Sequence, residues 1–112
     1  MDVGLKFPKG KTKKKRISHP ASILGSRKGR CCLCGRYTQT EEHHIFGGPN
    51  RTLSEQYGLK VDLCLECHQF GAHAVHKDQA VMDELHRQGQ EAFEEQTGSR
   101  EQFRKIFGRS WL

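Results

Sequence analysis

The amino-acid sequence predicts a small α+β domain that is cross-linked by a bound metal ion. Three observations carry this prediction: two C-x2-C pairs, alternating apolar residues next to the second pair, and apolar residues at helical spacing in the C-terminal third. The chain has 112 residues, which leaves room for one domain, because single domains usually contain roughly 100 to 150 residues. We therefore expect one folded unit with a small core.

Positive charge is concentrated at the start of the chain. Residues 1–30 contain ten Lys and Arg against Asp2 alone, a net charge of +9, whereas residues 31–112 contain nine against twelve acidic residues, a net charge of −3. We predict a flexible basic tail over residues 1–18 and a folded domain over residues 19–112. A polyanion is the simplest partner for such a tail, since basic side chains on phosphates displace counterions, and a solubilising leader is the alternative. The candidate contacts to nucleic acid are Lys11, Lys13, Lys14, Lys15 and Arg16.

The composition argues against a membrane protein and against a secreted one. No apolar run approaches the roughly 18 residues that a membrane helix requires. Residues 1–16 lack the apolar stretch and the small-residue cleavage site of a secretory signal. We therefore expect a cytoplasmic protein whose cysteines remain reduced.

Local signals predict the elements of the folded domain up to its central loop. Residues 19–24 either begin a short helix or pack Ile23 and Leu24 on the core. Residues 37–46 are predicted to form a strand or a hairpin. A loop is predicted at residues 47–50, Gly-Gly-Pro-Asn, because glycine permits positive φ and proline prevents a helix from continuing through it.

The second half of the chain predicts one strand and two helices. Residues 58–65 should form a half-buried strand, because apolar side chains alternate there. The longest helix is expected over residues 78–96, where apolar residues recur at helical spacing. Ser99 and Gln102 match a capping box, so a short final helix should follow and bury Phe103 and its neighbours. With a core over residues 31–76, these helices would occupy residues 78–108.

Four of the five cysteines form the two C-x2-C pairs, and this spacing in a reducing compartment indicates a metal site rather than disulfides. Two such pairs can supply a tetrahedral four-thiolate zinc site. Cys32 could substitute for its neighbour Cys31, and four buried cysteines without metal are the alternative. A closed four-thiolate site has no open coordination position, so any chemistry must occur elsewhere. The predicted zinc ligands are Cys31, Cys34, Cys64 and Cys67.

The histidines form an ordered series with the cysteine pairs. The series is Cys31-x2-Cys34, then Glu42-His43-His44-Ile45, then Cys64-x2-Cys67-His68. Over roughly residues 31–76 it resembles the HNH endonuclease family, in the version with two C-x2-C pairs. The Gly-Gly-Pro-Asn-Arg loop and the Gly-Ser-Arg-Glu segment resemble small HNH proteins of bacteriophages and prophages, which implies a phage-infected or prophage-bearing bacterial cell.

The resemblance implies a ββα-metal fold, also called a His-Me finger, with one divalent cation such as Mg²⁺, Mn²⁺ or Ni²⁺ in a groove for a phosphodiester. His44 matches the general base that takes a proton from the attacking water. His43 and His68 match metal ligands, and either His73 or His76 could complete the metal site in place of His68. The cation would stabilise charge on the scissile phosphate and on the departing 3′ oxygen.

The chain departs from the family pattern at the asparagine, and its two adjacent histidines raise a geometric problem. The family's middle asparagine normally lies just before the second cysteine pair, where this chain has Gly58-Leu59, so Asn50 is the candidate catalytic residue that orients the base. In addition, successive residues on a strand point to opposite faces. His43 and His44 would therefore reach one site only if the strand bends, and the two glycines after Phe46 make a bend plausible.

The resemblance predicts a metal-dependent DNA endonuclease or nickase that hydrolyses phosphodiester bonds, with Arg51 as a candidate phosphate contact beside the groove. The first alternative is a non-catalytic zinc-ribbon module that binds DNA or RNA. The second is a phage accessory protein that docks on packaging or recombination proteins, with the acidic helix at residues 78–95 as its surface. The Glu42-His43-His44 step favours the enzyme, because a pure binding ribbon does not need it.

Overall fold

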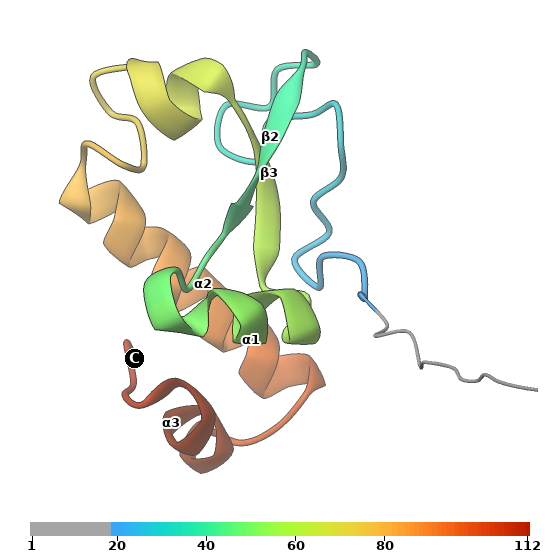
Figure 1. Ribbon diagram of the computed structural model, residues 1–112, viewed down its shortest axis with the longest axis vertical. Coiled ribbons are helices and arrows are strands. Elements are labelled where there is room, and N and C mark those ends of the chain that lie inside the picture. Colours follow the sequence, from blue (N-terminus) through green and yellow to red (C-terminus); the bar gives the residue numbers. More distant parts are fainter. Residues whose placement is uncertain (1–18) are drawn as a thin grey trace, which may run out of the picture.

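The computed structural model describes residues 19–112, and the basic tail predicted for residues 1–18, with its candidate nucleic-acid contacts, lies outside the described residues. The described chain forms a two-stranded antiparallel sheet, three α-helices and two short helical turns (Figure 1). The predicted α+β class is therefore confirmed. Among residues 19–112, none of the helices combines the length and the apolar character that a membrane span requires.

The sheet pairs β2 (Thr40–His44) with β3 (Lys60–Cys64). Thr40 lies opposite Cys64 and His44 lies opposite Lys60, so the sheet joins the cysteine pairs at one end to the histidines at the other. The alternating strand is confirmed as far as its end, because Leu59, Val61 and Leu63 are fully buried. Leu65 differs and is 40% exposed, because it has helical backbone angles just past β3.

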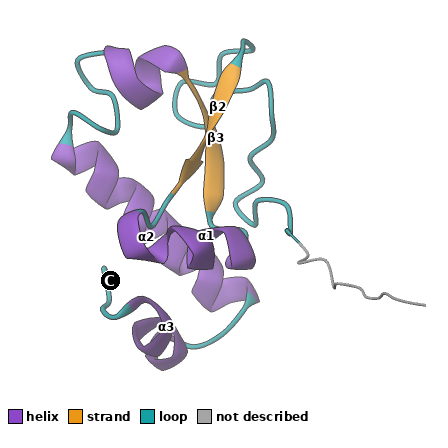
Figure 2. Cartoon of the chain, in the orientation of Figure 1, coloured by secondary structure: helices purple, strands orange, loops and turns teal. Residues whose placement is uncertain are grey.

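The outer edge of β3 is covered by the loop that precedes β2 (Figure 2). The amide of Ile23 donates to the carbonyl of Gly58, and the amide of Cys32 donates to the carbonyl of Asp62. The amide of Asp62 in turn donates to the hydroxyl of Ser26. Residues 19–24 form no helix, and of the two predicted alternatives it is packing of Ile23 and Leu24 on the core that occurs.

A helix that the sequence analysis did not anticipate follows the central loop. The turn η1 (Gly48–Asn50) leads directly into α1 (Arg51–Tyr57). Ser54, fully buried, fastens α1 to the end of β2, because its hydroxyl accepts from the amide of Phe46 and donates to the Phe46 carbonyl. Gly58 ends the helix with φ of 70°, and a Cβ there would lie only 2.5 Å from the carbonyl oxygen of Ala21.

The two C-terminal helices form as predicted. α2 (Gln79–Gln96) is capped by the carboxylate of Asp78, and α3 (Arg100–Phe107) begins with the capping box formed by Ser99 and Gln102. α2 packs closely on the chain that leaves β2: a Cβ at Gly89 would lie 3.0 Å from Ile45 and 3.1 Å from Phe46. A larger residue at this crossing would therefore require the Ile45 and Phe46 side chains to shift.

The hydrophobic core lies between the sheet, α2 and α3. Phe46 from the end of β2, Phe93 from α2 and Phe103 from α3 are fully buried, with the Phe103 ring 5.3 Å from Phe46 and 5.2 Å from Phe93. His86 packs against this core, because its ring stacks on Phe46 and also contacts Trp111. This core holds the C-terminal end of β2, which carries His43 and His44, in place.

Candidate functional site

The four cysteines of the C-x2-C pairs converge at the end of the sheet that carries Thr40. Their sulfur atoms all lie within 4.8 Å of one another, and the Sγ atoms of Cys34 and Cys64 are 3.8 Å apart. Sulfurs bound to one tetrahedral zinc ion at about 2.3 Å would be about 3.8 Å apart. The cluster of Cys31, Cys34, Cys64 and Cys67 is therefore positioned to hold a metal ion, and its spacing is consistent with zinc.

Backbone amides and burial shift the pKa values of two of these thiols. The amide of Cys34 donates to the sulfur of Cys31, and the amide of Cys67 donates to that of Cys64. Burial acts to raise the pKa of Cys31, yet the amide hydrogen bonds lower it to about 6. Burial, together with the adjacent thiols, raises the pKa of Cys67 well above its usual range. Four ionised thiolates at this spacing therefore require a cation. Cys32 lies outside the cluster and lines a separate pocket.

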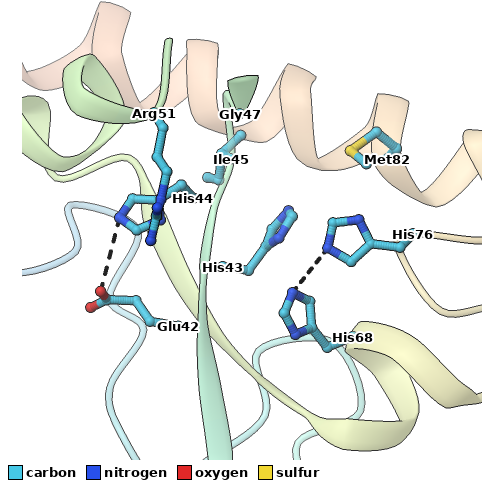
Figure 3. Close-up of a pocket in the computed structure, with 9 residues that line it drawn as sticks. All are labelled: Glu42, His43, His44, Ile45, Gly47, Arg51, His68, His76 and Met82. Carbon is cyan, nitrogen blue, oxygen red and sulfur yellow. Dashed lines mark hydrogen bonds and ion pairs between the residues drawn. The ribbon is translucent and has the colours of Figure 1, made fainter. Parts of the chain in front are cut away.

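A second site lies at the other end of β2, where a pocket of about 240 Å³ opens beside the strand (Figure 3). His43 and His44 point to opposite sides of β2, as the strand geometry requires, and both line this pocket. The bend that the sequence analysis invoked is not needed to bring both residues to one pocket. The side chains of His43 and His44 instead contact two different sets of residues.

His43 faces His68 and His76 (Figure 3). One ring nitrogen of each lies within 4.8 Å of the other two, and Nε2 of His68 is 3.0 Å from Nε2 of His76. His68 is carried by the helical turn η2 (Glu66–Phe70), and its Nδ1 lies 2.8 Å from a carboxylate oxygen of Glu41. Since a carboxylate only accepts, Nδ1 donates this hydrogen bond and the lone pair of neutral His68 lies on Nε2, facing the cluster.

The environment of His43 suits a metal ligand. The residue is 5% exposed, and within the described residues its Nε2 is buried without a hydrogen-bond partner. Burial lowers the pKa of His43 to about 4, and the nearby His68 and His76 act in the same direction. The imidazole therefore stays neutral near pH 7, and a neutral imidazole coordinates metal. A buried, unpaired nitrogen is costly, and a bound cation would offset this cost.

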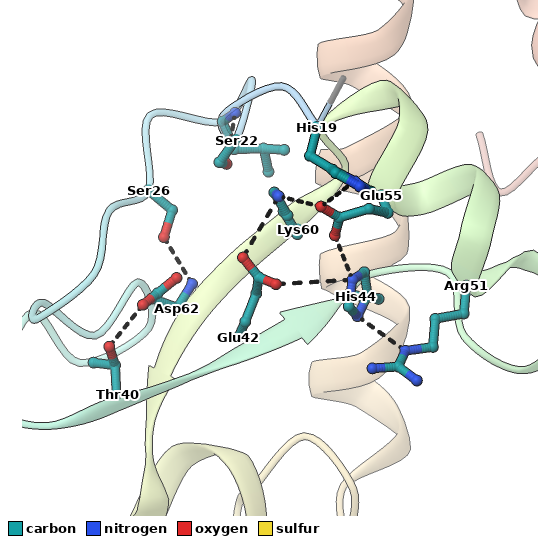
Figure 4. A network of polar contacts seen from close by, with 11 residues as sticks. His19, Ser22, Ser26, Thr40, Glu42, His44, Arg51, Glu55, Lys60 and Asp62 are labelled. Atoms are coloured by element: carbon teal, nitrogen blue, oxygen red, sulfur yellow. Dashed lines mark hydrogen bonds and ion pairs between the residues drawn. The ribbon is translucent and has the colours of Figure 1, made fainter. Parts of the chain in front are cut away.

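His44 belongs to a separate polar network on the opposite side of β2 (Figure 4). Its Nε2 lies 2.8 Å from Oε1 of Glu55, and its Nδ1 lies 3.4 Å from Nε of Arg51. Glu55 can only accept and Arg51 can only donate. Both contacts therefore require the same tautomer of His44, with the proton on Nε2 and the lone pair on Nδ1.

Lys60 supports this network from β3. Its ammonium lies 2.8 Å from Glu55 and 3.5 Å from Glu42, and Glu55 also pairs with His19 at 3.0 Å. The hydrogen bond from Lys60, followed by that from His44, lowers the pKa of Glu55 to about 2. Glu55 therefore carries its negative charge throughout the physiological range and remains an acceptor for the Nε2 proton.

Two residues proposed for the site from sequence lie elsewhere. Asn50 was expected to orient His44, but its side-chain amide donates to the carbonyl of Phe107, and the partners of His44 are Glu55 and Arg51. Of the two candidates to complete the metal site, His76 joins the cluster. His73 pairs instead with Asp78, and its side chain is 86% exposed. Arg51 lines the pocket as expected.

Two carboxylates in the site were missed by the sequence analysis. Glu41 lies two residues before His43 on the same side of β2, so strand alternation could have identified it. Glu55 lies on α1, which the sequence analysis did not predict, and no local signal linked it to His44. No protein-family model matches the chain, and comparisons with curated proteins and with solved structures also found no match.

Proposed function

We propose that this protein is a metal-dependent nuclease of the ββα-metal type that hydrolyses phosphodiester bonds in DNA. One observation carries the proposal: His43, which belongs to a converging cluster of three histidines, and His44, whose hydrogen bonds fix its tautomer, line the same pocket from adjacent positions of one strand. A zinc-binding module without catalysis needs neither. The order of two antiparallel strands followed by a histidine-bearing helical turn is consistent with this fold.

Each group in the pocket then has a role. His43, His68 and His76 would hold one divalent cation, and the four cysteines would hold a structural zinc ion. A cation held there would supply Lewis-acid stabilisation of the scissile phosphate and of the departing 3′ oxygen. The protein's own residues must supply the base, its orientation and the contact to the phosphate.

Nδ1 of His44 is the basic atom in this proposal, because the hydrogen bond to Glu55 occupies Nε2. As Nδ1 takes a proton from water, the imidazole becomes positively charged, and the carboxylate of Glu55 stabilises that charge. Arg51 donates to Nδ1 without substrate. A phosphate that enters the pocket attracts this guanidinium and leaves the lone pair of Nδ1 open to water.

The decisive experiment is a nicking assay on supercoiled plasmid with Mg²⁺, Mn²⁺ or Ni²⁺. Nicking should require added metal, and His44→Ala should lower the rate by about 100-fold or more, since a general base contributes roughly that factor. His73→Ala is the matched control, because His73 lies outside the pocket, and it should nick like the wild type. Metal-independent nicking, or an unaffected His44→Ala variant, would overturn the proposal.

A further inference from the structure

Exposed apolar side chains gather around the two cysteine pairs. Among the described residues, four of the five large hydrophobic side chains that are exposed lie within or beside these pairs. Tyr37 is 77% exposed and Phe70 is 65% exposed. The metal cluster itself does not require aromatic residues at these positions. These four residues are Leu33, Tyr37, Leu65 and Phe70.

The segment that contains the first cysteine pair is basic. Residues 19–40 contain no Asp or Glu and have four Lys and Arg side chains. All four are exposed, and none forms an ion pair with a carboxylate of residues 19–112. The arrangement therefore presents uncompensated positive charge to solvent. The four are Arg27, Lys28, Arg30 and Arg36.

A short hairpin holds the basic and aromatic groups together. Arg30 forms a β-bridge with Tyr37, and the Arg30 guanidinium lies over the tyrosine ring, 5.6 Å from its centre. The amide of Cys31 donates to the carbonyl of Arg36 across the hairpin. Because Cys31 also belongs to the cysteine cluster, a bound metal would fix the hairpin in this conformation.

Two pockets extend the surface on either side of the hairpin. Arg27 and Arg30 line one pocket of about 240 Å³, whereas Arg36 and Phe70 line another of about 340 Å³. The first pocket therefore carries two arginines, and the second combines an arginine with an exposed aromatic ring. We call this set the knuckle surface; it comprises Arg27, Arg30, Arg36, Tyr37 and Phe70.

We propose that the knuckle surface binds single-stranded DNA. Arginines pair with phosphates, and exposed aromatic rings stack on bases, which is the combination that holds single strands without a sequence preference. Bases of an intact duplex are stacked on one another and offer no face to Tyr37 or Phe70. The positive charge of the surface is complementary to the phosphates of a nucleic acid.

The knuckle surface lies close enough to the histidine pocket to contribute to substrate binding. This part of the inference rests on the proposed nuclease function. Thr40 and His44 are the two ends of β2, about 14 Å apart at about 3.4 Å per residue. This separation corresponds to about four nucleotides at the spacing of stacked bases. A strand held at the knuckle surface could therefore continue into the histidine pocket, and the preferred substrate would have an unpaired segment beside the cleaved bond.

Binding alone tests the inference, in the full-length chain carrying His44→Ala so that DNA is not cut. Fluorescence anisotropy would compare labelled oligo-dT with a duplex of the same length. Tyr37→Ala should weaken oligo-dT binding about tenfold or more, the usual effect of losing one stacking ring. Tyr37→Phe should keep wild-type affinity. Arg104→Gln, at an exposed position of α3, is the control for loss of one positive charge elsewhere.

Three outcomes would overturn the inference: unchanged oligo-dT binding in Tyr37→Ala, an equal loss on duplex, or an equal loss in Arg104→Gln. Zinc content and circular dichroism identify a variant that has unfolded, and Phe70→Ala then replaces it, with the same expected loss. Plasmid nicking by the wild type is scored separately. A chain that binds oligo-dT through Tyr37 but never nicks would refute the nuclease proposal alone.

Discussion

Nε2 of His44 and Oε1 of Glu55 lie 2.8 Å apart and join strand β2 to helix α1 beneath the pocket. Arg51, the second partner of His44, comes from the same helix. The tautomer of His44 therefore depends on how α1 is attached to the strand. Ser54, the one buried residue of α1, supplies that attachment through both of its hydrogen bonds to Phe46.

Glu55→Gln should slow plasmid nicking by at least about tenfold, because a neutral amide cannot stabilise the charge that His44 gains as a base. The effect should appear in kcat, since Glu55 lies outside the histidine cluster that would hold the cation. Initial rates at saturating metal and DNA measure it. Glu84→Gln is the matched control, because Glu84 is an exposed residue of α2 that pairs with Arg87. Equal rates for both variants would exclude Glu55 as the positioning residue.

The sequence predicted elements whose local signals agree with their packing. Alternation located β3, helical spacing located α2, and Ser99 with Gln102 located the start of α3. α1 escaped prediction because it is short: its two apolar residues, Leu53 and Tyr57, are only partly buried, and two positions are too few to show helical spacing. It is held by the hydrogen bonds of Ser54 to Phe46 and by the packing of Tyr57 on Phe93 and Phe107, contacts that a local sequence pattern does not reveal.

The part of the site that depends on sequence spacing could be predicted. The part that depends on loop conformation could not. Two C-x2-C pairs can converge in few ways, and their four cysteines form the expected cluster. His73 and His76 could not be separated by sequence, because the loop after η2 determines which of them faces His43. In that loop the amide of Val75 donates to the carbonyl of Cys67, which places the next residue, His76, beside His68.

Purified protein should contain one tightly bound zinc ion per chain, and Cys64→Ser should remove it. Loss of the metal should also abolish cooperative unfolding, because structural zinc contributes folding free energy directly. Elemental analysis and thermal melting measure the two effects. Cys32→Ser is a close control, since Cys32 is next to Cys31 in sequence yet lies outside the cluster. Equal zinc loss in the two variants would show that Cys32 also binds the ion.

His68→Ala should weaken binding of a second divalent cation while the structural zinc is retained. The reason is that the two clusters share no ligand and lie at opposite ends of β2. Titration calorimetry of zinc-loaded protein with Ni²⁺ should show about a 10-fold to 100-fold loss of affinity, of the order seen when a metal site is weakened. His73→Ala should bind Ni²⁺ like the wild type. Unchanged affinity in His68→Ala would place the second cation elsewhere.

Stability should fall in acid partly because of His43. Its pKa is lowered to about 4 in the folded chain, chiefly by burial, whereas an unfolded histidine takes up a proton near pH 6.5. Between these values the unfolded state binds more protons, so the contribution of His43 is complete above about pH 6.5 and is lost as pH falls towards 4. Across that window the loss would be at most about 3 kcal/mol.

His43→Phe tests this origin, because a phenyl ring of similar size cannot take a proton. Urea unfolding at pH 7 and at pH 5, without added divalent cation, would give the free energy of unfolding of both proteins. The wild type should lose more stability than His43→Phe between the two pH values. Protonation of the cysteine cluster affects both proteins alike and cancels in the difference, while His73→Asn controls for removing an exposed histidine. Parallel losses in the wild type and His43→Phe would mean that His43 does not remain neutral in the folded chain, and its assignment as a metal ligand would lose its electrostatic basis.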